Sequence, residues 1–304
     1  MQKGIKFRIY PNREQKNFIH QTLGCCRLIY NRGLAMRKEG YEKGEKIGYG
    51  QTSAMLTELK KQEEFAFLKA ADSIALQQSL RDLDRSFVNF FQKRASYPTF
   101  KSKHNRFQSY RTVNQKDNIR IVGRYIKLPK LGFVKIRQSM EVGKINHVTI
   151  EYTPAGKYFA VLNIDFEPEP RPNAGGTIGI DVGIKAFYSD SNGNTVSNPR
   201  YLERSMRKLI REQRRLSRKQ KDSHNRGKQR LRVARVHEKI ANQRNDFLQK
   251  QSVMRLREPS SFIREENTRY IVAWVLSLPW KTEAKTVTSR RALRSSFLKE
   301  LRVV

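Results

Sequence analysis

The sequence predicts an α+β protein of several domains, because the spacing of its apolar residues changes repeatedly along the chain. Residues 3–11 alternate apolar with polar groups, residues 14–91 follow helical spacing, and residues 118–166 return to short alternating runs. After a proline-rich hinge at 167–176, further short strands lead into a basic helical region. At 304 residues and 38% hydrophobic content, the chain is long enough to bury more than one core.

The N-terminal third predicts one strand and then a helical bundle. In KGIKFRIYP, three apolar residues fall on one face, Lys6 and Arg8 fall on the other, and Pro11 ends the run. From Leu76 to Phe91, apolar side chains recur three or four residues apart, with charged residues on the opposite side. We therefore expect a half-buried strand with a basic outer face, followed by helices.

The middle of the chain predicts antiparallel strands. NIRIVGRYIKLPKLGFVKIR and HVTIEYTPAGKYFAVLNIDFEPEP are short strand-like runs broken by Gly, Pro and Asn, and TPAGK predicts a hairpin turn. We expect a small barrel or sandwich that the N-terminal strand completes. Beyond the hinge, TIGIDVG and AFYSDSNGNTVSN predict three more strands, and antiparallel strands followed by helices indicate an open α/β layer.

The strong positive charge predicts a nucleic-acid partner. Lys and Arg number 62 against 28 Asp and Glu, which gives a net charge of +34. Such an excess repels itself in a compact state unless a polyanion neutralises it. The adjacent Cys25 and Cys26 form neither a disulfide framework nor a CxxC pair, which fits a reducing cytosol. Because the chain has no long apolar run and no signal-peptide core, we expect a cytoplasmic protein that does not bind membranes.

Residues 200–250 predict a basic helical hairpin. They hold 18 Lys and Arg against 5 Asp and Glu, and KDSHNRG at 221–227 interrupts the helical pattern. The first helix carries an apolar stripe of Leu202, Met206, Leu209 and Leu216. A solvated helix face is the alternative, but the excess is too one-sided for ions that pair with one another. We expect the phosphate-binding side chains to be Arg207, Lys208, Arg211, Arg214, Arg215, Arg218 and Lys219.

Asp181 suggests one ligand of a metal site. It ends the apolar strand of IGIDVGIKAF between Gly179 and Gly183, which let a backbone or a ligand approach closely. A carboxylate in this position suits Mg²⁺, which prefers oxygen ligands. Asp before a glycine turn is equally a common turn residue, so this residue alone leaves both interpretations open.

Other polar and aromatic residues give weaker indications. The five histidines, at positions 20, 104, 147, 224 and 237, show no metal-ligand spacing. The stretch SYPTFKSKHNRFQSY interleaves aromatic and basic groups, as in surfaces that stack on bases. Its aromatic residues are Tyr97, Phe100, Phe107 and Tyr110. Packing against the strands explains Phe100 equally well.

Four stretches of the sequence carry a family resemblance: FVNFFQKRASYPTFKSKHNRFQSYR, IRIVGRYIKLPKLGFVKIR, GIDVGIKAF and IANQRNDFLQKQS. In order and spacing they resemble the insertion-sequence OrfB proteins called TnpB, from about residue 3 to residue 252. The resemblance implies an oligonucleotide-binding-like β-barrel with an inserted helical recognition lobe, followed by a RuvC-type, ribonuclease-H-like nuclease domain.

The resemblance also implies domain boundaries. The first barrel strand would occupy residues 1–10, the recognition lobe 11–97 and the rest of the barrel 98–170. The N-terminal part of the RuvC-like domain, including the basic hairpin, would occupy 171–252, and residues 253–304 would form a divergent tail.

The function implied by the resemblance is that of a transposon-encoded, RNA-guided DNA endonuclease, commonly labelled a transposase. Its partners would be a guide RNA and double-stranded DNA, and it would be found at the nucleoid of a prokaryotic cell. Asp181 matches the first catalytic carboxylate of the family. In the intact family, two Mg²⁺ ions held by several carboxylates would activate water. Lysines and arginines would hold the backbone of an RNA–DNA duplex.

The sequence departs from the family pattern beyond residue 252. Trp274 and Val275 stand where the second carboxylate is expected, no Asp follows Asp246, and the paired CxxC motifs of the zinc ribbon are missing. Glu265 and Glu266 precede the expected strand instead of ending it. Since one carboxylate cannot hold two Mg²⁺ ions, we expect a truncated or degenerate member with an incomplete magnesium site, no zinc and no cleavage activity. The alternative is an RNA-guided repressor that binds DNA without cutting it.

Overall fold

The computed structural model describes residues 1–105, 107–137, 140, 142–167 and 179–257. The chain divides into two compact units, one formed by residues 1–171 and 201–242 and the other by residues 172–200 and 243–304. Residues 168–176 of the hinge predicted at 167–176, and residues 258–304 of the tail predicted at 253–304, lie outside the described residues. None of the described helices combines the length and the apolar character needed to cross a membrane.

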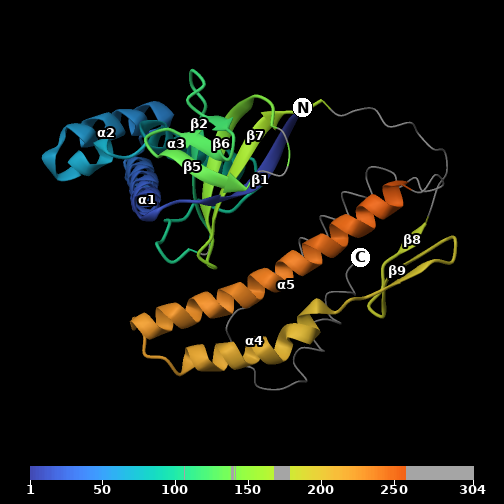
Figure 1. Ribbon diagram of the computed structural model, residues 1–304. Coiled ribbons are helices and arrows are strands. Elements are labelled where there is room, and N and C mark those ends of the chain that lie inside the picture. The colour runs from blue at the N-terminus through green and yellow to red at the C-terminus, as the bar shows by residue number, and fades with distance from the viewer. Residues whose placement is uncertain (106, 138–139, 141, 168–178, 258–304) are drawn as a thin grey trace. The chain divides into compact units, whose positions relative to one another are not determined.

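The first unit is built on one antiparallel sheet of seven strands, in the order β2-β6-β7-β1-β5-β4-β3 (Figure 1). The sheet is curled, and its described ladder begins at β2 and ends at β3. The predicted role of the N-terminal strand is confirmed, because β1 lies between β7 and β5. The strands are β1 (Gln2–Tyr10), β2 (Gln108–Val113), β3 (Arg120–Val122), β4 (Tyr125–Leu128), β5 (Gly132–Arg137), β6 (Ile145–Tyr152) and β7 (Tyr158–Asp165).

The predicted TPAGK turn is also confirmed. It joins β6 to β7, and the backbone N–H of Thr153 donates to the carbonyl of Lys157 at 2.9 Å. Gly156 has a φ of 77°, a left-handed conformation that glycine adopts without the strain other residues would meet. The alternating pattern of β1 holds as well, since Phe7 and Ile9 are buried whereas Lys6 is not.

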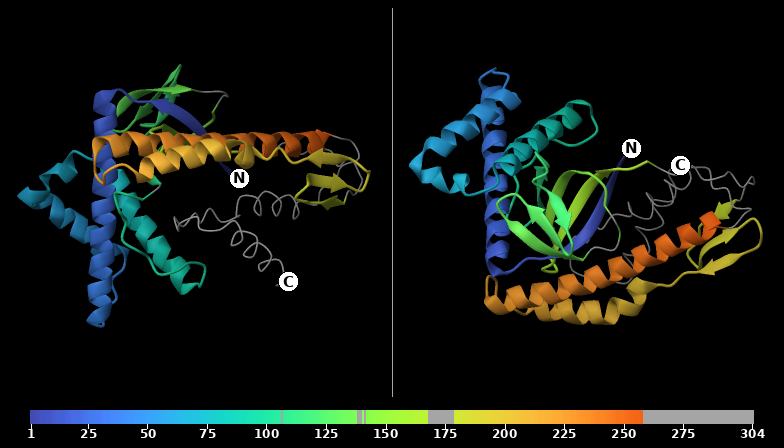
Figure 2. Two further views of the ribbon diagram at one scale, coloured as in Figure 1. Left: turned by 90° about the horizontal axis from the view of Figure 1, so that it is seen from below. Right: turned by 45° about the horizontal axis from the view of Figure 1, so that its top comes forward.

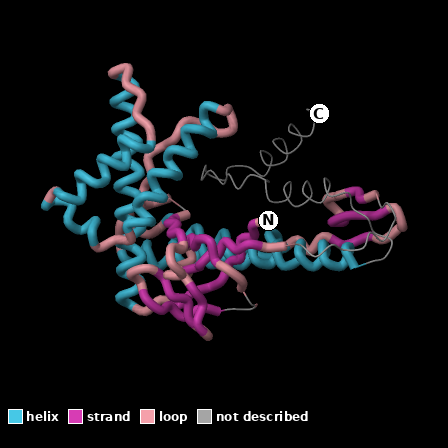
Figure 3. Tube along the Cα trace, turned by 90° about the horizontal axis from the view of Figure 1, so that it is seen from above, coloured by secondary structure: helices cyan, strands magenta, loops and turns pink. Residues whose placement is uncertain are grey.

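The helical bundle predicted for the N-terminal third is confirmed. It consists of α1 (Arg13–Glu42), α2 (Tyr49–Lys61), the 3₁₀ helix η1 (Glu63–Lys69) and α3 (Ser73–Phe91), which lie to one side of the sheet (Figure 3). The Asn12 side chain caps α1 by accepting from the backbone N–H of Gln15 at 2.8 Å. Gly33 lets α1 approach α3 closely, because a Cβ there would lie 3.0 Å from Leu80 and from Leu83. Helices and sheet share one continuous hydrophobic core.

The predicted helical hairpin is confirmed, but its break lies at residues 218–223, a few residues before the predicted 221–227. Helices α4 (Tyr201–Ser217) and α5 (His224–Arg257) run side by side in both views of Figure 2. Leu209 of α4 packs against Val236 and Ile240 of α5. The apolar stripe expected on α4 is only partly buried: Leu209 is 6% exposed, whereas Leu202 is 39% and Met206 37% exposed.

The three strands predicted after the hinge are confirmed as a small antiparallel sheet in the second unit, in the order β10-β9-β8. They are β8 (Ile180–Asp181), β9 (Ala186–Asp190) and β10 (Thr195–Ser197). Gly193, in the turn between β9 and β10, has a φ of 83°. The close approach predicted at Gly183 is also observed, because a Cβ there would lie 3.3 Å from the carbonyl oxygen of Ala186.

Candidate nucleic-acid interface

The exposed face of α4 carries the predicted phosphate-binding side chains. All seven are exposed: Arg207, Lys208, Arg211, Arg214, Arg215, Arg218 and Lys219. Five of them form no ion pair with the part of the chain that the structure describes, namely Arg207, Lys208, Arg214, Arg218 and Lys219. These cations are therefore available to an external anion.

The spacing of three of these arginines forms a straight stripe. Arg214 lies seven residues and Arg218 eleven residues after Arg207, which places all three on one face of a helix. The backbone N–H of Arg218 donates to the carbonyl of Arg214 at 3.3 Å, so the helical turn continues past the end of α4. At about 1.5 Å per residue the stripe is about 16 Å long. Measured along the axis of a duplex, at about 3.4 Å per phosphate of one strand, that length corresponds to the rise of about five base pairs.

A buried carboxylate positions the other two arginines. Glu212 is 6% exposed and lies 3.2 Å from Arg215 and 3.7 Å from Arg211. Gln229 of α5 donates to the carboxylate at 2.7 Å and to the backbone carbonyl of Glu212 at 3.1 Å. The hydrogen bond from Gln229 lowers the pKa of Glu212, and Arg215 and Arg211 lower it further. The hairpin is thus tied together beneath its cationic face.

Asp181, the predicted metal ligand, is exposed at the end of β8, opposite Ser189 of β9. Its carboxylate forms no hydrogen bond or ion pair with any described residue. Asp190 has a turn role of its own, between β9 and β10, where its carboxylate accepts from the backbone N–H of Asn192 at 3.0 Å and of Asn194 at 2.8 Å.

The second unit brings two of the family-like motifs together. Phe187 of β9 meets Phe247 of α5 edge to face, with ring centroids 5.0 Å apart. The hydroxyl of Tyr188 donates to the side chain of Gln251 at 3.4 Å. GIDVGIKAF and IANQRNDFLQKQS, which lie far apart in the sequence, therefore form one packed element.

The described residues do not fit a magnesium ion. Among them, no three His, Cys, Asp or Glu side chains lie close enough together to hold a metal. Asp181 alone would supply one carboxylate, whereas Mg²⁺ requires near-octahedral oxygen coordination. Glu265, Glu266, Trp274 and Val275 lie outside the described residues. No catalytic step through a metal follows from this geometry.

The predicted base-stacking aromatic residues divide into two groups. Tyr97, Phe100 and Phe107 are 44%, 56% and 76% exposed, so Phe100 is not a core residue and base stacking by these three rings stays a prediction. Tyr110 is only 6% exposed and belongs to the core, so the stacking interpretation is wrong for this residue. Burial raises the pKa of Tyr110.

Desolvation within the fold shifts the pKa of two of the histidines and of both cysteines. His20 lies 2.8 Å from the Tyr158 hydroxyl, and desolvation lowers its pKa. Desolvation also lowers the pKa of His147, with a further contribution from Arg111. Cys25 and Cys26 are both free thiols in the hydrophobic core, and burial raises the pKa of each.

The chain has a mixed α/β fold with a curled sheet and a strongly cationic helical hairpin. The cationic hairpin places it in the class of nucleic-acid-binding proteins. Residues 147–255 match the OrfB family model of IS605 elements, described as a probable transposase, and residues 1–46 match its helix-turn-helix model. In this structure residues 1–46 form strand β1, the single helix α1 and the turn after it.

Two relatives carry the printed name "Putative RNA-guided DNA endonuclease". One, from Streptomyces pristinaespiralis, is 37% identical over 272 residues, covering 88% of this chain and 67% of the relative. The other, InsQ of Escherichia coli (strain K12), is 35% identical over 254 residues, covering 82% of this chain and 62% of the relative. The chain belongs to this OrfB family, also called TnpB, and spans about two thirds of the length of these relatives.

One solved structure is also similar to this chain. It is a Cas12f1–sgRNA–target DNA complex determined by cryo-electron microscopy, at 12% sequence identity and a TM-score of 0.42. The similarity covers 84% of this chain and 78% of the other.

Proposed function

We propose that this chain binds a guide RNA and double-stranded DNA, since its relatives are named RNA-guided DNA endonucleases, and that it does not cleave. The observation that carries the binding proposal is the exposed stripe of arginines on α4 without carboxylate partners. Such a stripe suits the evenly spaced phosphates of a duplex backbone, whereas guide pairing would read the target sequence.

The finer fold assignment belongs to this proposal. The curled sheet with its helices would serve as the oligonucleotide-binding-like barrel and recognition lobe, divided at residues 10, 97 and 170 as the sequence predicts. Strands β8–β10 and the end of α5 would begin a RuvC-like domain, because they unite the two family-like motifs around Phe187 and Phe247. Asp181 would then stand at the position of the first catalytic carboxylate.

The absence of cleavage is proposed from the residues present. Asp181 forms no cluster with other described acidic residues, and Trp274 and Val275 stand where the second carboxylate of the family pattern is expected. A pair of catalytic metal ions needs several carboxylates, so one exposed aspartate is insufficient. The chain would then occupy DNA without cutting it, which also suits the alternative role of an RNA-guided repressor.

The test uses the purified chain, RNA transcribed from its own locus, and a plasmid library with magnesium. We expect sequence-dependent retention of plasmid DNA by the RNA-loaded protein and no cut ends. Cleavage that is lost in Asp181→Ala would overturn the proposal of inactivity. Failure to retain any discrete RNA or DNA, when InsQ assayed in parallel retains both, would overturn the binding proposal.

A further inference from the structure

The outer face of strands β1, β3, β4 and β5 alternates aromatic and basic side chains. On β5, Val134 and Ile136 point into the core, so Phe133, Lys135 and Arg137 point outward. The same alternation turns further side chains of β1 and β4 outward. We call the following six residues the aromatic–basic face: Tyr10, Tyr125, Lys127, Phe133, Lys135 and Arg137.

Strand pairing places rings beside cations across this face. Lys135 pairs with Tyr10 on one side and with Tyr125 on the other. Lys127 pairs with Phe133. With about 4.8 Å between strands, Tyr10 and Tyr125 lie about 10 Å apart with Lys135 between them. Tyr10, Tyr125 and Phe133 are 42%, 47% and 51% exposed. The Arg8 guanidinium already lies over the Tyr10 ring, 5.0 Å from its centroid, so Tyr125 and Phe133 offer the more accessible ring surfaces.

The face has an unbalanced positive charge. Arg8 stands directly opposite Arg137, and Arg120 stands directly opposite Lys127. Like charges in directly opposed positions destabilise a sheet. The four strands contain neither Asp nor Glu, so no carboxylate within them relieves this repulsion. An external anion would relieve it.

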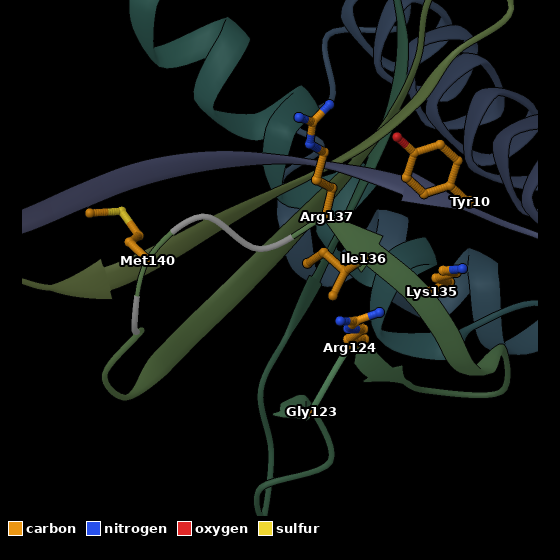
Figure 4. Close-up of a pocket in the computed structure, with 7 residues that line it drawn as sticks. All are labelled: Tyr10, Gly123, Arg124, Lys135, Ile136, Arg137 and Met140. Atoms are coloured by element: carbon orange, nitrogen blue, oxygen red, sulfur yellow. The ribbon is translucent and has the colours of Figure 1, made fainter.

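An open hollow adjoins this face. It has a volume of about 870 Å³, within the range of about 300–1,000 Å³ typical of ligand sites. Figure 4 shows Tyr10 projecting from β1 beside Arg137 and Lys135 of β5, with Arg124 at the turn between β3 and β4. One ring and three cations around a hollow can take a base together with its phosphates.

We propose that the aromatic–basic face binds an unpaired stretch of RNA, with bases stacked on its rings and phosphates on its lysines and arginines. Duplexes keep their bases stacked internally, so exposed rings favour a single strand. A protein partner fits less well, because lysine is depleted at protein–protein interfaces. The choice of RNA over single-stranded DNA rests on the proposed function, in which the guide supplies unpaired nucleotides.

The first experiment uses the unaltered protein and a synthetic oligouridine of about 10 nucleotides containing 5-iodouridine, a length within the site sizes of single-strand-binding folds. Ultraviolet crosslinking followed by peptide mass spectrometry locates the bound bases. We expect crosslinks at Tyr10, Tyr125 or Phe133. Crosslinks found only outside residues 1–10 and 118–137 would overturn the proposal. The same would follow if oligodeoxyuridine crosslinked there and oligouridine did not.

The second experiment measures affinity by fluorescence anisotropy. Each ring removed should weaken oligouridine binding by about 5- to 150-fold and leave duplex DNA binding within about 2-fold. The variant is Tyr125→Ala with Phe133→Ala, and its matched control is Tyr41→Ala with Phe67→Ala, two rings that are also exposed. Equal losses in variant and control would overturn the proposal. Phe133→Trp in the Tyr125→Ala background should restore binding, which a merely structural role would not predict.

The two proposals can fail separately. If the chain retains no guided DNA but oligouridine still crosslinks to the aromatic–basic face, the proposed function falls and the face remains an RNA site. If guided retention succeeds and the crosslinks lie only on α4, this inference falls and the proposed function stands.

Discussion

Replacing the arginine stripe of α4 gives a quantitative test of how the chain holds nucleic acid. The variant is Arg207→Gln with Arg214→Gln and Arg218→Gln. These three side chains are exposed and form no ion pair with described residues, so their removal costs the fold little. Any large effect on binding then reports lost phosphate contacts.

The expected magnitude follows from counterion release. For duplex DNA, the logarithm of the association constant falls linearly with the logarithm of the salt concentration. Each phosphate contact adds about −0.9 to the slope of that line. Losing three contacts should therefore make the slope shallower by about 2.7. Between about 50 and 200 mM salt, the unaltered chain should lose about 40-fold more affinity than the variant.

Fluorescence anisotropy of a labelled duplex across a salt series measures this slope directly. The matched control replaces three exposed lysines elsewhere in the first unit, Lys61→Gln, Lys116→Gln and Lys144→Gln, which removes the same charge. The slope of the control should become shallower by less than about 1, compared with about 2.7 for the variant. If variant and control shift the slope equally, the effect is one of net charge, and the reasoning about the α4 stripe is refuted.

Three further predictions concern stability and ionisation. Leu80→Ala, at a core position with no exposed surface, should lower the free energy of unfolding by about 2–5 kcal/mol in urea denaturation. Stability should fall as pH drops below 6.5, because the lowered pKa of His147 makes the unfolded chain bind more protons, and His147→Gln should flatten that fall. Gln229→Leu should raise the pKa of Glu212 toward its ordinary value, as measured by NMR titration of the carboxyl group.

Each of these predictions has a control and a contradicting result. Val88→Ala, at an exposed position of α3, should cost less than about 0.5 kcal/mol, and a loss equal to that of Leu80→Ala would contradict the core assignment. His224→Gln, at an exposed residue, should leave the pH profile unchanged. An unaltered Glu212 titration in Gln229→Leu would mean that the neighbouring arginines alone set its pKa.

The periodic elements could be predicted from the sequence because their patterns are local. The alternation around Phe7 and the helical spacing around Leu80 each show, within a few residues of sequence, which face of the element is buried. The role of Gln229 could not be predicted, since it depends on α5 folding back against Glu212. The burial of Tyr110 was missed for the same reason: its partners come from helices distant in the sequence.

The candidate site likewise has one part that could be predicted from the sequence and one that could not. The charge of α4 was visible in composition, and all seven predicted side chains are exposed as that prediction requires. The aromatic–basic face was not visible, because Tyr10, Tyr125 and Phe133 come from three strands whose pairing register decides that they are neighbours. Surfaces assembled across a sheet leave little trace in any single stretch of sequence.

The opposed Arg8 and Arg137 affect the stability of the protein when no nucleic acid is bound. A sheet that carries repelling cations is less stable alone than when a polyanion lies across it. Any ligand that binds only the folded form raises the free energy of unfolding, by about 2.7 kcal/mol when present at a hundredfold excess over its Kd. If RNA binds the aromatic–basic face as proposed, the RNA-free protein should unfold more readily than the bound form, and the supply of RNA would help to set how much of the protein survives.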